Sequence, residues 1–115
     1  GEDVYAAIRY FGERGKIFYV HFRNVKGTVP KFEESFINDG DVDMYKAMRT
    51  YKEVGFNGMM IPDHVPHLVN DPGWGYRSRA YAVGYMQALL DVLNLCMPEG
   101  GRFLDLSTST GLSPR

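Results

Sequence analysis

The main indication of the fold is the segment Lys16-Ile-Phe-Tyr-Val-His-Phe-Arg23. It is almost continuously apolar and rich in aromatic and β-branched residues, which is typical of a strand covered on both faces in a parallel sheet. A second short apolar run, Gly58-Met-Met-Ile-Pro62, ends at a proline and indicates a second buried strand. We therefore predict a parallel sheet that contains both segments.

The spacing of apolar residues predicts three helices, over residues 3–11, 44–54 and 77–95. In each segment apolar side chains recur every three or four positions, which is the repeat of one helical face. Asp41 or Asp43 can cap the second helix, because a carboxylate at that position accepts from the first free backbone N–H groups. The predicted apolar stripe of the third helix comprises Tyr81, Tyr85, Ala88, Leu89, Val92 and Leu95.

Two irregular stretches, residues 24–41 and 65–75, follow the predicted strands and are interpreted as long loops. The alternation of helices and strands is the one that builds a parallel sheet, either open or closed into a barrel. Both loops leave the carboxyl ends of strands, where such folds bind ligands.

A closed eight-stranded barrel takes about 250 residues. The chain therefore holds a little more than a quarter of one, and we expect open sheet edges unless other strands complete it.

Composition excludes several classes of function. The chain has 115 residues, 44% of them hydrophobic, and a net charge of -1 with scattered basic residues, so we expect no nucleic-acid partner. It has no apolar stretch of membrane-spanning length and no secretory signal, and its single cysteine, Cys96, suits a reducing compartment. We therefore expect a cytoplasmic protein without membrane contact. Because the chain begins at Gly1 without an initiator Met, we also expect that processing or truncation has removed a preceding part.

Seven short motifs follow one another between Asp3 and Leu95. They are Lys16-Ile-Phe-Tyr-Val-His-Phe-Arg-Asn24, Lys31-Phe-x-Glu-x-Phe36, Asp39-Gly-Asp-Val-Asp-Met44, Glu53-Val-Gly-Phe-Asn-Gly58, Pro62-Asp-His-Val-Pro66, Gly75-Tyr76 and Gly84-Tyr-Met86. Taken together they resemble the C-terminal part of the mannonate dehydratase family. The resemblance implies an α/β fold that is part of a (β/α)8 TIM barrel, with roughly two βα units and a preceding helix in residues 1–97. Residues 98–115 are predicted to be an irregular tail.

The resemblance also implies a hydro-lyase that uses Mn²⁺ or Fe²⁺ to dehydrate D-mannonate to 2-dehydro-3-deoxy-D-gluconate in hexuronate breakdown. Removal of the C2 proton builds negative charge beside a carboxylate, so the reaction needs a cation together with an acid and a base. His21 and Asp63 are suitable metal ligands, and the family supplies another histidine and a cysteine from earlier strands. His64 and Tyr76 are the candidate acid and base, in either order. Arg23, on the same strand face as His21, is a candidate for binding the substrate carboxylate through two hydrogen bonds.

Each candidate also has a purely structural interpretation. His21 can be a hydrogen-bonded core residue, Asp63 and His64 can cap a turn, and Tyr76 can pack over the loop. The adjacent acids Glu33 and Glu34 are interpreted as loop surface that can contact the substrate, without a catalytic role.

Two other functions stay open from the sequence. One is a metal-dependent sugar isomerase of the same barrel superfamily, and the other is a truncated, inactive product. For the dehydratase we expect D-mannonate as the small-molecule partner and a homo-oligomer of the full-length protein.

Overall fold

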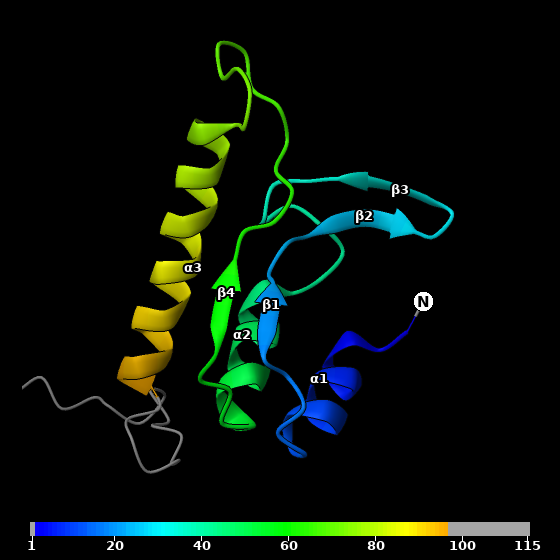
Figure 1. The fold of residues 1–115 in the computed structure, drawn as a ribbon, viewed down its shortest axis with the longest axis vertical. Coiled ribbons are helices and arrows are strands. Elements are labelled where there is room, and N and C mark those ends of the chain that lie inside the picture. Colours follow the sequence, from blue (N-terminus) through cyan, green and yellow to red (C-terminus); the bar gives the residue numbers. More distant parts are fainter. Residues whose placement is uncertain (1, 97–115) are drawn as a thin grey trace, which may run out of the picture.

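The computed structural model describes residues 2–96, which form three helices and four short strands (Figure 1). The tail predicted over residues 98–115 lies outside the described residues. Within residues 2–96, no helix combines the length and the apolar character needed to cross a lipid bilayer.

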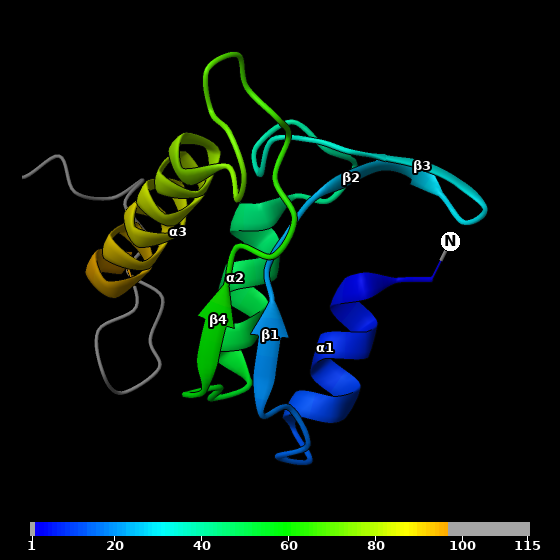
Figure 2. The same ribbon diagram turned by 45° about the horizontal axis from the view of Figure 1, so that its top comes forward.

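The centre of the fold is a parallel pair of strands. β1 (Tyr19–His21) lies beside β4 (Met59–Ile61), with Tyr19 opposite Met59 and His21 opposite Ile61. Figures 1 and 2 show both strands running in the same direction, with α2 (Met44–Glu53) behind them. The predicted parallel pairing is confirmed, and among the described residues the outer edge of each strand has no further strand beside it.

Only one face of this strand pair is covered by the described residues. Val20 and Phe22 are buried and join Ile8 and Met48 in the core. On the opposite face Tyr19 is 48% exposed and Met59 65% exposed. The expectation of strands covered on both faces is therefore wrong for the described residues. The helices pack on one side of the sheet, and successive strand residues point to opposite sides.

The three predicted helices are confirmed as α1 (Val4–Gly12), α2 and α3 (Tyr76–Cys96). Asp3 caps α1 by accepting hydrogen bonds from two backbone N–H groups, and Asp43 caps α2 by accepting from the N–H of Lys46 at 2.9 Å. Asp41, the other capping candidate, accepts from the N–H of Gly27 at 2.7 Å instead. Gly55 ends α2 with a φ of 73°, a conformation that costs glycine little.

The buried face of α3 differs from the predicted stripe. Tyr81, Val92 and Leu95 are 47%, 45% and 75% exposed. The buried positions are Ser78, Ala82, Met86, Leu89 and Leu93. Apolar residues occupy more than one side of this helix, so spacing alone did not identify the side that meets the core.

Residues 24–41, predicted to be an irregular loop, contain an antiparallel hairpin. β2 (Val25–Thr28) pairs with β3 (Lys31–Glu34), and the hairpin projects away from the parallel strands (Figures 1 and 2). The loop prediction is wrong here because the hairpin buries little apolar surface, so its strands lack the alternation of polar and apolar residues that marks a half-buried sheet. Its backbone hydrogen bonds form without that signal.

A buried asparagine attaches this hairpin to the rest of the fold. Asn24 is 2% exposed, and its amide nitrogen donates to the carbonyls of Ile37 at 3.0 Å and Val42 at 2.8 Å. Its amide oxygen accepts from the N–H groups of Val42 at 3.0 Å and Val25 at 3.1 Å. A Cβ atom at Gly40 would lie 2.1 Å from that oxygen, so only glycine fits there. The side chain thus joins the end of β1 to the loop that enters α2.

Replacement of Asn24 by alanine is expected to destabilise the protein by about 2–4 kcal/mol, because it leaves several buried backbone groups without partners. Urea unfolding measures this difference. Asn57→Ala is the matched control, since Asn57 is exposed in the turn before β4. Equal free energies of unfolding for the two variants would contradict the role given to Asn24.

Candidate active site

The carboxyl ends of β1 and β4 bring three predicted site residues into contact. His21 is the last residue of β1, and Asp63 follows β4 by two positions. Nδ1 of His21 lies 3.2 Å from Oδ1 of Asp63, and Nε of Arg23 lies 3.2 Å from Oδ2 of the same carboxylate. The two oxygens of Asp63 therefore face two different side chains. One is that of His21 at the end of β1, and the other is that of Arg23, two residues further along the chain. The Asp63 side chain is 17% exposed.

His64 lies beside this group and is open to solvent, with a side chain 62% exposed. Its Nε2 is 3.8 Å from Oδ1 of Asp63. Its Nδ1 is 2.9 Å from Nη1 of Arg23 and 3.0 Å from Oε1 of Glu34. His64 can therefore exchange protons with a bound molecule while its other nitrogen is held by protein groups.

Glu34 joins this group, although the sequence predicts no more for it than a surface contact with substrate. It is the last residue of β3, and its Oε1 accepts from Nη1 of Arg23 in addition to meeting His64. Its Oε2 is buried and has no hydrogen-bond partner among the described residues. The signal that could have identified it is the pairing of Val25 with Glu34 across the hairpin, which places the residue next to the end of β1. Because the hairpin was predicted to be a loop, that signal was not available.

Arg23 bridges two acidic groups. Its Nε faces Asp63 and its Nη1 donates to Glu34. The predicted pairing with a substrate carboxylate through two hydrogen bonds needs two adjacent N–H groups, so one of these contacts would have to be released first. The same guanidinium can otherwise reach a ligand through Nη2.

A second arginine fixes the loop that carries Asp63. Arg79 on α3 donates from Nη1 to the carbonyl of Asp63 and from Nε to the carbonyl of Trp74, both at 2.7 Å. The two ends of the 63–74 stretch are thus tied to one side chain. No sequence pattern marks Arg79, because its partners are backbone carbonyls that come within reach only in the folded loop.

Tyr76 does not join the cluster of His21, Arg23, Asp63 and His64. It is the first residue of α3, it is 70% exposed, and among residues 2–96 it makes no side-chain hydrogen bond or ring contact with that cluster. The structure therefore brings together four of the five predicted residues and leaves Tyr76 on the surface beyond the loop.

The start of α3 is held by a buried carboxylate. Asp71 is 6% exposed, and its side chain accepts from the N–H of Arg77 at 3.0 Å and from the N–H of Ser78 at 3.1 Å. The hydrogen bond from Arg77 is the main cause that lowers the pKa of Asp71 below its ordinary value of 3.8, while burial opposes the shift and Ser78 adds to it. The charged form of Asp71 thus stabilises the turn that precedes Tyr76.

Two of the clustered residues have the chemistry of metal ligands. His21 offers an imidazole nitrogen and Asp63 a carboxylate oxygen, a set that suits Mn²⁺ or Fe²⁺. Within residues 2–96 no group of three or more His, Cys, Asp or Glu side chains is placed to hold an ion. The described residues therefore fit part of a coordination sphere and would need further ligands from outside them.

Comparison with known proteins shows the family of the chain. Residues 1–98 match the family model described as D-mannonate dehydratase (UxuA). The chain belongs to the mannonate dehydratase family.

Relatives in this family are much longer than the chain. It is 37% identical over 86 residues to the mannonate dehydratase of Brachyspira hyodysenteriae, and the aligned region covers 70% of this chain and 24% of that protein. It is 33% identical over 98 residues to mannonate dehydratase 2 of Halalkalibacterium halodurans, covering 80% of this chain and 28% of that protein. The crystal structure of mannonate dehydratase from Streptococcus suis serotype 2 matches with a TM-score of 0.73 at 26% identity, over 88% of this chain and 31% of that one. The chain thus spans about a quarter of the length of the curated family members it matches.

The lowered pKa of Asp71 predicts how stability depends on pH. Its pKa is lower in the folded than in the unfolded protein, so its contribution to folding is present above the ordinary value and is lost as the pH falls through the folded-state value. We expect Asp71→Asn to be less stable than the wild type at pH 7, with the difference shrinking below pH about 4.

Urea unfolding at a series of pH values measures this dependence. Asp91→Asn is the control, because Asp91 is exposed on α3, the helix whose start Asp71 holds. A stability difference between wild type and Asp71→Asn that stays constant through the acidic range would disagree with the assignment.

Proposed function

We propose that the chain is part of an enzyme that dehydrates D-mannonate to 2-dehydro-3-deoxy-D-gluconate. The observation that carries the proposal is the contact of His21, Arg23 and His64 with one carboxylate, Asp63, at the carboxyl edge of a parallel strand pair. Catalytic groups of α/β barrels lie at this edge. Membership of the family supports the same reaction.

In this proposal His21 and Asp63 would hold Mn²⁺ or Fe²⁺, which supplies positive charge for the carboxylate and hydroxyl of the substrate. The dehydration removes a proton from C2 and releases the C3 hydroxyl with a proton as water. His64 and Tyr76 are proposed for these two proton transfers, in either order. Arg23 is proposed to bind the substrate carboxylate after release of one of its present acidic partners.

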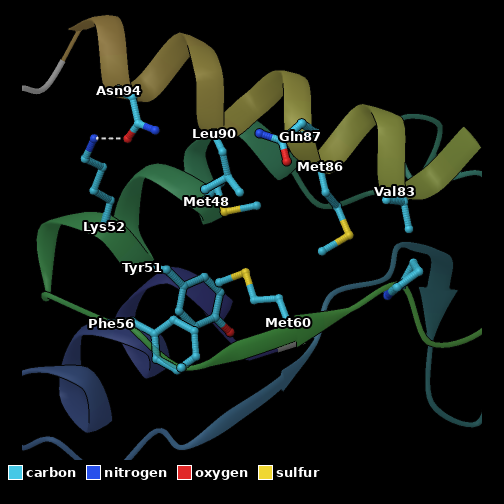
Figure 3. Close-up of a pocket in the computed structure, with 12 residues that line it drawn as sticks. Met48, Tyr51, Lys52, Phe56, Met60, Val83, Met86, Gln87, Leu90 and Asn94 are labelled. Carbon is cyan, nitrogen blue, oxygen red and sulfur yellow. Dashed lines mark hydrogen bonds between the residues drawn. The ribbon is translucent and has the colours of Figure 1, made fainter.

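The described residues are proposed to be a section of a (β/α)8 barrel, with residues 1–97 as the α/β unit. An apolar pocket of about 450 Å³ lies between α2, α3 and β4, and Met48, Tyr51 and Met60 point into it (Figure 3). A second pocket, of about 330 Å³, lies between α1 and β1. Additional strands beside β1 and β4 could fill these two pockets with their side chains. The pockets therefore support the proposal that further strands extend the sheet at both edges.

Three statements stay predictions from the sequence and the resemblance: the assignment to the C-terminal part of a dehydratase, the homo-oligomer and the cytoplasmic location.

The activity is tested in what we call the completed enzyme. This is a polypeptide in which residues 1–98 are joined to the remaining barrel of a matched relative. Turnover of D-mannonate by the completed enzyme supports the proposal, whereas turnover of an aldose alone would favour the isomerase.

Loss of metal on replacement of His21 tests its role as a ligand. We expect His21→Ala in the completed enzyme to lose bound Mn²⁺ and dehydratase activity together, because one protein donor is removed. Metal content by elemental analysis and the rate of D-mannonate dehydration measure the two effects. His67→Ala is the matched control, since His67 is exposed and lies in the loop after β4. Unchanged metal content in His21→Ala would remove His21 from the ligand set.

Replacement of His64 separates proton transfer from metal binding. We expect His64→Asn in the completed enzyme to retain Mn²⁺ while its kcat falls by roughly 10²–10⁴-fold, the usual contribution of a general acid or base. The same two measurements apply. Full activity of the variant would show that His64 does not transfer a proton in the reaction.

A further inference from the structure

The residue that the proposed mechanism leaves unused is Glu34. It reaches the site from the hairpin, about 30 residues before His64 along the chain. Its side chain is 29% exposed, and every described contact that it makes is with Arg23 or His64. A carboxylate in this position can determine how the neighbouring imidazole carries its proton.

The three side chains leave two possible states for Nδ1 of His64. This nitrogen is 3.0 Å from Oε1 of Glu34 and 2.9 Å from Nη1 of Arg23. Glu34 can only accept when ionised, and Arg23 can only donate. A protonated Nδ1 therefore bonds to Glu34, whereas an unprotonated Nδ1 bonds to Arg23.

The supply of donors and acceptors favours the bond to Glu34. Arg23 already has an acceptor at Nε, Asp63, and another at Nη1, which is Glu34 itself. The Glu34 carboxylate has a single donor among the described residues, Nη1 of Arg23, although its Oε1 has a second lone pair that can accept from Nδ1–H of His64. A carboxylate short of donors gains more from a second N–H than a guanidinium with two acceptors gains from a third acceptor.

We propose that Glu34 is a positioning residue of the active site, which accepts a hydrogen bond from Nδ1–H of His64. In the neutral ring this bond leaves Nε2 unprotonated. Nε2 is the nitrogen that lies on the Asp63 side, 3.8 Å from Oδ1. Glu34 thus orients the ring so that Nε2 is the nitrogen through which His64 transfers a proton, in either direction. The inference rests on the proposed dehydratase function and adds a residue from the hairpin to it.

The position of the proton on His64 is the direct test. In metal-free completed enzyme labelled with ¹⁵N-histidine, at a pH where the ring is neutral, the nitrogen shifts and couplings distinguish the two tautomers. His64→Asn assigns the signal. We expect the Nδ1–H form in the wild type, and loss of this preference in Glu34→Gln. A wild-type ring protonated on Nε2 overturns the inference, and that measurement needs no folded variant.

Steady-state kinetics tests the role in the reaction. We expect Glu34→Gln to lower kcat by about 10–100-fold, the usual effect of losing a partner that orients a site group, with KM for D-mannonate changed by less than about threefold. Glu33→Gln is the matched control. Glu33 precedes Glu34 on β3, is exposed and points to the other face of the hairpin.

The outcomes separate this inference from the proposed function. Equal kcat values in Glu34→Gln and Glu33→Gln, in an active wild type, overturn the positioning role and leave the dehydratase intact. A wild type that does not dehydrate D-mannonate contradicts the proposed function and with it the catalytic role of Glu34. The tautomer measurement still decides the Glu34–His64 contact in that case.

Discussion

The four hydrogen bonds of the buried Asn24 side chain hold together the parts on which the site depends. They join the residue after Arg23 to the loop that leads into α2, and the absence of a side chain at Gly40 leaves room for them. Because every donor and acceptor of the amide is used, the side chain can be buried without an uncompensated polar group. The hairpin is thereby fixed above the carboxyl end of β1, where it can deliver Glu34.

Charge complementarity then organises the site above that frame. Arg23 lies between the carboxylates of Asp63 and Glu34, and His64 meets both acidic residues through different ring nitrogens. One positive charge between two negative ones reduces the repulsion that would otherwise separate them. Arg23 follows β1, Asp63 and His64 follow β4, and Glu34 ends the hairpin, so the cluster forms only when the parallel pair and the hairpin are both in place.

The exposed face of the strand pair fits a section of a larger sheet. Tyr19 and Met59 lie on the face opposite the helices, and the pockets beside β1 and β4 are lined mainly by apolar side chains. Burial of such exposed apolar side chains by other elements would lower the free energy of the folded protein. The proposed metal site is incomplete in the same way, because His21 and Asp63 would supply two ligands and a complete site needs more.

The repeat of apolar residues and the motifs at the strand ends are local signals. They were enough to predict the three helices and the two parallel strands and to single out His21, Arg23, Asp63 and His64, which the structure brings together. Three other features depend on packing: the hairpin, the side of α3 that faces the core and the place of Glu34 in the site. The hairpin forms through backbone hydrogen bonds without an apolar pattern, α3 has apolar residues on more than one side, and Glu34 meets His64 only across 30 residues of chain. Contacts of that kind depend on how the elements pack, which no local pattern records.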